Sequence, residues 1–465
     1  MPRPDRATVE DLLAAVHEHA STYLDGLDGR PVRATATAAQ LRTPLGGTLP
    51  DRGTDPRAVV DALAHDAHLT MTATTSARFF GFVIGGVLPA AMAADMLTPV
   101  WDQNAGMHVV GPLAAAAEET VRTWLVDLLG LPSHASLGLV TGGQMANTTA
   151  LAVARHHVLA RAGWDVERNG VAGGPAVTVV AGTERHSTID RGMRFVGLGG
   201  RPVLVDVDGN GAMRPTALGD VLDHVDGPVV VCAQAGNVNT GALDPVGAIC
   251  DVAHRRDAWV HVDGAFGLWA ACSPRLRGRL EGLGGADSWA VDAHKWLNVP
   301  YDSGIVLTAH PASHLAATGT DPAQASYLAF AEDARDPMQW TAEASRRARG
   351  FAVWAALRSL GRDGVVALVD RCCALAARFA EQLAAEPGIT IHNDVVLNQV
   401  LVGFDDVDAG AVAAAVQRDG TCWLGGTTWR GRSLVRLSVS NWQTDTDDVD
   451  RSVEAIVSCY RALRA

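Results

Sequence analysis

Lys295 is the only lysine among the 465 residues of this chain, and all other basic side chains among the 38 are arginines. Arginine can replace lysine wherever a solvated positive charge is sufficient, but its guanidinium stays protonated and cannot act as a nucleophile. A buried lysine can lose its proton and form an imine with a carbonyl group. The retained lysine therefore indicates a covalent site, with a surface lysine left over by chance as the alternative.

A glycine turn between a predicted strand and an alanine-rich helix provides a second chemical feature. The segment LVTGGQMANT occupies residues 139–148. Backbone amides at Gly143 and Gln144 would open the helix, where the helix dipole favours an anion such as phosphate. Turns of this kind also occur for purely steric reasons, so the segment alone does not identify a phosphate site.

Two more polar residues follow predicted strands. His186 comes just after the strand at 177–181, and Asp263 ends the buried strand at 259–262. A buried aspartate is costly unless a cation pairs with it, and a protonated pyridine nitrogen would serve. Ala265 is small enough for a flat ring to lie against it. A lone histidine after a strand is more often structural, so His186 carries weight only together with the other residues.

These features fit together at one edge of a sheet, where open α/β folds gather ligand-binding groups. The spacing between Asp263 and Lys295 leaves room for one helix and one strand, which would place both residues at the same edge. A strand-end carboxylate, a phosphate turn, a histidine that can stack on a ring and one amine together predict a pyridoxal-phosphate site.

The segment around Lys295 resembles the pyridoxal-lysine signature of the group II amino acid decarboxylases, which include aromatic amino acid, glutamate and histidine decarboxylases. The similarity covers most of the chain, from about Phe79 to the C-terminus, and is typical of a bacterial branch. The matching segments are ADS at 286–288, HKW at 294–296, NVPYD at 298–302, FFGF at 79–82, ADML at 94–97, HVD at 261–263 and RRAR at 346–349. The resemblance implies the fold type I architecture of pyridoxal enzymes and a homodimer with active sites at the subunit interface.

Roles follow from the resemblance, position by position. Lys295 would form the aldimine with the cofactor, His186 would stack on its ring, and Asp263 would pair with the ring nitrogen. Ala265 would lie under the ring. Tyr327 falls where the family has a tyrosine on a mobile loop that guards or protonates the carbanionic intermediate. Further residues expected near the cofactor are Gly143 and Gln144 at the phosphate turn, His294, and Asn237 in the loop GNVNT at 236–240.

Some positions depart from the family pattern. Asp292 stands where better-known relatives often have Asn or Ser, and its carboxylate would repel the phosphate unless it is turned away or paired. Gly143 and Met145 stand where many relatives carry hydroxyl side chains, so backbone amides must contribute more of the phosphate binding.

We expect decarboxylation of an L-amino acid to its amine and carbon dioxide. An aminotransferase is the nearest alternative, because Arg436 on a late strand could clamp the substrate carboxylate; an aldehyde synthase and a catalytically silent homodimeric scaffold are the others. The residues predicted to line the side-chain pocket are Phe82, Val83, Ile84 and Trp101, which suggest an apolar or aromatic substrate, although they could equally be interface core. No cation is evident for a side-chain carboxylate, which argues against glutamate and aspartate.

The elements that must position these residues have an α/β pattern. β-branched apolar runs at 177–181, 203–205, 229–232, 259–262 and 305–307 alternate with alanine-rich stretches, which predicts a mostly parallel sheet covered by helices. We expect helices at 9–23 and 55–68, a loop at 30–56, a long helix at 342–360 and a small α+β domain with strands at 398–402 and 434–439. The predicted domains are an N-terminal helical arm (1–90), a large cofactor-binding domain (91–345) and a small C-terminal domain (346–465).

Composition narrows the class of protein. A net charge of −13 and a pI of about 5.6 argue against nucleic acid or an anionic membrane as partner. The N-terminal residues lack a basic segment followed by an apolar stretch, so we expect a cytoplasmic protein. Seven cysteines without metal-ligand spacing predict reduced, buried thiols and no metal site.

Overall fold

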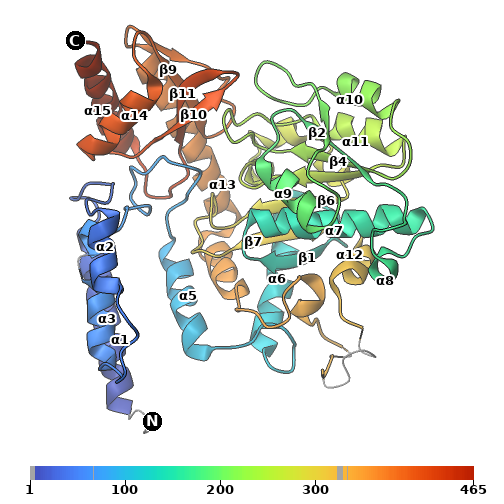
Figure 1. The fold of residues 1–465 in the computed structure, drawn as a ribbon, viewed down its shortest axis with the longest axis horizontal. Helices are drawn as coiled ribbons and strands as arrows, with labels where there is room; N and C mark the ends of the chain where they lie inside the picture. The colour runs from blue at the N-terminus through green and yellow to red at the C-terminus, as the bar shows by residue number, and fades with distance from the viewer. Residues whose placement is uncertain (1–5, 66, 322–327, 332) are drawn as a thin grey trace.

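The computed structural model describes residues 6–65, 67–321, 328–331 and 333–465. At its centre is a seven-stranded sheet with the order β1-β7-β6-β5-β4-β2-β3 (Figure 1). The strands are β1 (Ser136–Val140), β2 (Thr178–Gly182), β3 (Val203–Val205), β4 (Val229–Gln234), β5 (Trp259–Asp263), β6 (Ser288–Asp292) and β7 (Gly304–Thr308). Neighbouring strands are parallel except where β7 pairs with β1 and with β6. The predicted mostly parallel sheet is therefore confirmed.

The central strands are apolar because helices cover the sheet. Every position of β1, β4, β5, β6 and β7 is buried, as expected for strands covered on both faces. Helix α7 (Gly143–Arg161) packs across β5, β6 and β7. The other helices of this domain are α6 (Pro112–Leu129), α8 (Val166–Asn169), α9 (Ser187–Phe195), α10 (Pro215–Leu222), α11 (Val246–His254) and α12 (Pro311–Thr318).

A smaller domain with an antiparallel sheet forms the C-terminal part of the chain, as predicted. Its strand order is β10-β11-β9-β8. The bounds are β8 (Ile389–Ile391), β9 (Gln399–Phe404), β10 (Gly425–Trp429) and β11 (Arg432–Ser438), with helices α14 (Ala409–Asp419) and α15 (Thr446–Arg464). Helix α13 (Gly350–Ala384) runs from the large domain to this sheet and changes direction at Gly361, whose φ is 62°.

The N-terminal helices stand beside the main body as an arm (Figure 1). The helices are α1 (Arg6–Asp25), α2 (Ala38–Leu45), α3 (Pro56–Ala64), α4 (Ala67–Thr70) and, next to the body, α5 (Pro89–Trp101). Helix α1 packs on α3, yet among their described residues Ala15 alone is buried. The arm therefore has almost no core of its own.

Some predictions of secondary structure were wrong. The loop predicted at 30–56 contains α2, which begins at a capping box made by Thr37 and Gln40. The long helix begins at Gly350, because the backbone of Arg346 is held by Asn104 and Ala105, and it continues to Ala384. Glycines interrupt the segment between β5 and β6, so it forms three short 3-10 helices, at Gly267–Cys272, Arg277–Leu280 and Leu283–Gly285, instead of one α-helix.

Residue 90 lies in the first turn of α5 and residue 345 just before α13, and the division into three domains remains a prediction. Within the described chain, no helix has both the length and the apolar composition to cross a membrane, and no cluster of His, Cys, Asp or Glu side chains is arranged to hold a metal ion. The cysteines are unpaired; all are buried except the half-buried Cys459.

Candidate active site

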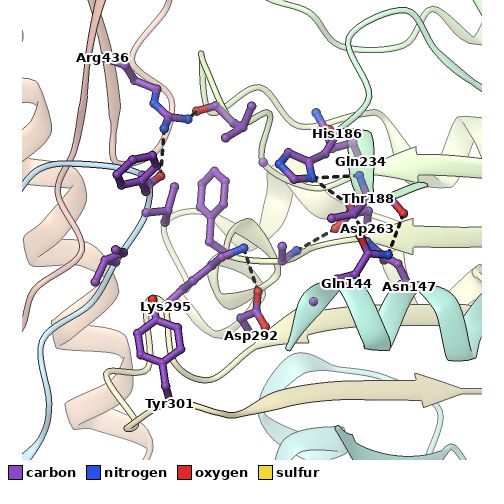
Figure 2. Close-up of a pocket in the computed structure, with 18 residues that line it drawn as sticks. Gln144, Asn147, His186, Thr188, Gln234, Asp263, Asp292, Lys295, Tyr301 and Arg436 are labelled. Atoms are coloured by element: carbon purple, nitrogen blue, oxygen red, sulfur yellow. Dashed lines mark hydrogen bonds and ion pairs between the residues drawn. The ribbon is translucent and has the colours of Figure 1, made fainter. Parts of the chain in front are cut away.

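A pocket of about 290 Å³ opens at the carboxyl ends of β4, β5 and β6 (Figure 2). Gln234, Asp263 and Asp292 are the last residues of these strands. The lining residues are Phe82, Val83, Ile84, Gly143, Gln144, Asn147, His186, Thr188, Gln234, Gly236, Val238, Asp263, Ala265, Phe266, Asp292, Lys295, Tyr301 and Arg436. The sheet edge predicted from the sequence therefore gathers most of the predicted site residues in one cavity.

Lys295 reaches into the pocket and forms an ion pair with Asp292. Its Nζ lies 2.8 Å from Asp292 Oδ2, and the two side chains are 24% and 1% exposed. The Asp292 backbone is anchored on both sides, because its N–H donates to the Ala265 carbonyl and its carbonyl accepts from Trp269 Nε1. The carboxylate that would repel a phosphate unless turned away or paired is thus paired with the single lysine.

The phosphate turn lies directly against this ion pair. Helix α7 begins at Gly143, and no side chain caps its first turn. A Cβ at Gly143 would lie 2.7 Å from Asp292 Oδ2, and one at Gly142 would lie 3.1 Å from His294 Cε1. Glycine is required because a side chain would collide with these groups, and the amides of an uncapped helix start are suited to an anion.

Asp263 is a buried carboxylate without a cationic partner in the described part of the chain. The side chain is 4% exposed and accepts long hydrogen bonds from the Ala265 amide (3.3 Å) and the Thr188 hydroxyl (3.5 Å). Burying a carboxylate with neutral donors alone is costly. A protonated ring nitrogen would provide the missing charge, so the environment of Asp263 fits a pyridoxal ring.

The orientation of His186 defines which of its nitrogens carries the proton. His186 precedes α9, and its Nδ1 accepts a hydrogen bond from the Thr188 N–H (3.3 Å) and lies 2.9 Å from the Thr188 hydroxyl. Burial lowers the pKa of His186, and the nearby positive charges of Lys295 and Arg436 lower it further, against the opposing effect of Asp263. The imidazole is therefore neutral, with its proton on Nε2.

A chain of hydrogen bonds behind the pocket leads to Thr188. Trp259 Nε1 donates to Ser288 Oγ (2.9 Å), which lies 2.9 Å from His261 Nδ1. On the other side of the ring, His261 Nε2 lies 2.9 Å from Asn147 Oδ1, and Asn147 Nδ2 donates to Thr188 Oγ1 (3.0 Å). Asn147 Oδ1 can only accept, so His261 Nε2 donates to it, and Nδ1 of the neutral ring accepts from the Ser288 hydroxyl. Burial lowers the pKa of His261 to about 4, which keeps it neutral. The Thr188 hydroxyl hydrogen is thereby left for Asp263 or His186.

The segment at 79–86, which we call the pocket strap, contacts both the small domain and the loop that follows β6 and carries Lys295. The Phe80 N–H donates to the Trp423 carbonyl, and the Gly86 N–H donates to Asn298 Oδ1 at 2.6 Å. A Cβ at Gly85 would lie 1.9 Å from the Lys295 carbonyl oxygen. The strap therefore lies against the backbone of the lysine and presents the side chains of residues 82–84 to the pocket.

Some predicted residues do not face the pocket. The Trp101 ring, at the end of α5, packs edge-on against Phe351 with centroids 5.4 Å apart. The Asn237 side chain is bound by backbone groups: Nδ2 donates to the Glu184 carbonyl, and Oδ1 accepts from the amides of residues 239 and 240 in its own loop. His294 is not among the lining residues either; its ring lies 4.3 Å from that of Tyr301, which does line the pocket. Tyr327 lies outside the described residues.

Arg436 reaches the pocket from β11 of the small domain (Figure 2). Its guanidinium donates to the carbonyls of Val238 (2.6 Å) and Phe82 (3.2 Å), and burial lowers its pKa to about 10. Within the described residues no carboxylate pairs with it. The arginine considered from the sequence as a clamp for the substrate carboxylate therefore lines the pocket, and β11 reaches it through the packing of the two domains.

Other residues that the sequence did not indicate are Asn147, Thr188, Gln234, Phe266 and Tyr301. The usable signals were polar residues in apolar elements: Asn147 in an alanine-rich helix, and Gln234 at the end of a valine-rich strand. Burial raises the pKa of Tyr301, so its hydroxyl remains protonated.

Comparisons with known proteins agree with this geometry. Residues 43–405 match the family model of the pyridoxal-dependent decarboxylase conserved domain. The chain is 31% identical over 290 residues to an aromatic-L-amino-acid decarboxylase of Bacillus atrophaeus, over 61% of this chain and 58% of that protein. It is 30% identical over 387 residues to an L-2,4-diaminobutyrate decarboxylase of Rhizobium meliloti (strain 1021), over 80% of this chain and 76% of that protein.

The fold is shared with a crystal structure of Oryza sativa TDC with PLP and tryptamine, with a TM-score of 0.91, 22% identity and coverage of 100% of both chains. The fold, the family match and the residues of the pocket all indicate a pyridoxal-phosphate enzyme. The chain belongs to the family of pyridoxal-phosphate-dependent amino acid decarboxylases. Its cofactor is pyridoxal 5'-phosphate.

Proposed function

We propose that this chain converts an L-amino acid with an apolar or aromatic side chain into the corresponding amine and carbon dioxide. The observation that supports this most is the convergence of Lys295, His186 and Asp263 on one pocket. An amine, a ring-stacking imidazole and a buried carboxylate are the groups that a pyridoxal cofactor needs.

Each residue has a defined task in this proposal. Bound pyridoxal phosphate supplies a ring that accepts the electron pair left behind when carbon dioxide departs. Lys295 would bond to the aldehyde carbon, the amides at Gly143 and Gln144 would bind the phosphate, and Asp263 would hold a proton on the ring nitrogen. His186 would pack on the ring, and its Nε2 proton is available for transfer to the substrate α-carbon.

The lining of the pocket supports an apolar or aromatic side chain. Phe82, Val83, Ile84, Phe266 and Tyr301 all line it. Its only carboxylates, among the described residues, are Asp263 and Asp292, which the cofactor site uses. A cationic substrate side chain would therefore find no acidic partner.

Arg436 favours a second candidate function, transamination. An arginine that holds the substrate carboxylate in the plane of the ring leaves the Cα–H bond, and not the bond to the carboxylate, perpendicular to it. The Arg436 guanidinium contacts two carbonyls and retains further N–H groups. The same cation would also suit an acidic substrate side chain, so glutamate and aspartate belong in any substrate screen.

Product analysis separates the candidates. The enzyme reconstituted with cofactor would be incubated with each of the twenty amino acids. Amine and carbon dioxide in equal amounts are expected from an apolar or aromatic substrate. A keto acid would show an aminotransferase, and an aldehyde with ammonia and peroxide would show an aldehyde synthase. Lys295→Ala should lose both turnover and the cofactor absorbance band; a wild-type protein that binds no cofactor would instead support a silent scaffold.

We also propose a cytoplasmic homodimer with shared active sites. The support is the apolar surface of the arm and of α5: Val9, Leu13, Leu63, Val100 and Trp101 are 46%, 52%, 72%, 61% and 48% exposed. Exposed apolar side chains gathered on a few helices are typical of subunit interfaces. Light scattering after size-exclusion chromatography should give twice the chain mass of 48.7 kDa. A monomer with full activity would refute shared sites.

A further inference from the structure

We propose that Asp292 takes the proton that Lys295 loses when it bonds to the cofactor, and then faces the phosphate as a neutral acid. The inference rests on the proposed role of Lys295 as the cofactor-binding amine. It concerns how the protein loads its cofactor and holds for any substrate.

Among the described residues, Asp292 is the carboxylate that pairs with the lysine. Its Oδ2 lies 2.8 Å from Lys295 Nζ, and its side chain is 1% exposed, so the carboxylate has little access to water. Its Oδ1 has no hydrogen-bond donor among the described residues. His294 Nε2 is 3.4 Å from Oδ1, but burial lowers the pKa of His294, so a neutral imidazole does not cancel the carboxylate charge.

The position of the carboxylate creates a conflict that a proton would resolve. Asp292 Oδ2 lies where a Cβ on Gly143 would be only 2.7 Å away, so it contacts the first turn of α7. The phosphate of the cofactor would bind at the same helix start. Two anions there repel each other, whereas a protonated Asp292 would donate a hydrogen bond to a phosphate oxygen.

The proton and atom balance is simple. The Lys295 ammonium gives one proton to Asp292 Oδ2 and becomes a neutral amine. Nζ then attacks the aldehyde carbon of the cofactor, a carbon–nitrogen double bond replaces the carbon–oxygen bond, and the oxygen leaves as water with the two hydrogens left on Nζ. Asp292 keeps the third hydrogen, and neither an oxidant nor a reductant is needed.

The test measures cofactor capture by the cofactor-free protein. Asp292→Asn keeps the shape of the side chain but cannot take the proton. We expect its covalent capture of pyridoxal phosphate, followed by stopped-flow absorbance at neutral pH, to be at least tenfold slower than wild type. It should bind 4'-deoxypyridoxine 5'-phosphate, which has no aldehyde, at least as tightly, because one negative charge is gone.

Controls separate this effect from damage to the site. Asp302→Asn removes a carboxylate of the same loop that pairs with Arg349 and not with the lysine, and should capture the cofactor at the wild-type rate. Asp292→Ser provides a second uncharged variant if Asp292→Asn folds poorly, with the same slow capture expected.

Two results would overturn the inference: capture by both Asp292 variants at the wild-type rate, or slow capture fully explained by weaker binding of the deoxy analogue. Borohydride reduction followed by peptide mapping shows whether the cofactor is attached to Lys295. This result distinguishes an error in the role of Asp292 from an error in the proposed cofactor site. A pyridoxyl group on Lys295 with unchanged rates overturns the role of Asp292 alone. A wild-type protein without the label on Lys295 overturns the proposed site as well.

Discussion

Glu118→Gln should destabilise the large domain, because Glu118 neutralises a completely buried arginine. Glu118 Oε1 and Arg346 Nη1 are 2.6 Å apart, and the two side chains are 1% and 0% exposed. Without the carboxylate charge, the guanidinium keeps only the carbonyls of Ala105 and Leu139. Removing one partner of a buried ion pair costs about 3–5 kcal/mol. Glu118 Oε2 and Arg346 Nε lack partners in the described structure, so we expect a cost near the lower end.

The assay is urea unfolding of the cofactor-free protein, followed by tryptophan fluorescence. A double variant, Glu118→Leu with Arg346→Met, removes both charges and should be more stable than Glu118→Gln, because no unpaired ion remains. Glu118→Gln should also weaken cofactor binding, since Arg346 holds the Leu139 carbonyl in the strand that leads to the phosphate turn. A cost below about 1 kcal/mol, typical of an exposed pair, would refute this reasoning.

Three further predictions concern pH, the pocket strap and the small domain. Burial lowers the pKa of His261 from 6.5 to about 4, so the unfolded chain takes up this proton first as the pH falls below about 6.5. Between pH 7 and 4, His261 alone should lower the free energy of unfolding by roughly 3 kcal/mol, and His157 and His314, whose pKa values are lowered to about 4 and about 3, add to the fall. The drop should therefore be about 3 kcal/mol smaller in His261→Asn than in the wild type. Gly85→Ala would place a Cβ 1.9 Å from the Lys295 carbonyl oxygen and should lower kcat/KM at least tenfold, whereas Gly209→Ala, with nothing within 4 Å, should match wild type. Arg436→Met should raise KM at least tenfold with unchanged cofactor absorbance, because Arg436 lines the pocket with N–H groups to spare; an unchanged KM would show that Arg436 does not contact the substrate.

The cofactor-facing residues could be predicted from the sequence because their positions depend on local rules. Asp263 ends an apolar strand and Lys295 follows another, and in a mostly parallel sheet such positions share one edge. The structure brings both to the predicted pocket. Their chemical roles stay predictions, as does the role of Tyr327.

Other features depend on packing between distant parts of the chain. Arg436 joins the pocket only because the small domain folds against the strap, and Trp101 turns toward Phe351 because α5 packs on α13. No local pattern determines any of these arrangements.

The same limit applies to the fold. Alternating apolar strands predicted the mostly parallel sheet, since burial on both faces leaves a clear compositional signal. The short 3-10 helices between β5 and β6 and the short α2 have no such signal. Their apolar faces are small, and local caps and glycines decide where they begin and end.

The pocket strap combines closely packed glycines with side chains that line the pocket. Its glycines are fixed against Trp423, Lys295 and Asn441, where an added Cβ would approach within 2.0, 1.9 and 2.3 Å. The three side chains between these anchors line the pocket, whereas the groups proposed to hold the phosphate and the ring nitrogen belong to α7 and β5. A change of side chain at positions 82–84 therefore alters the lining of the pocket, whereas a side chain added at any of the three glycines would push the strap away from the groups that it packs against.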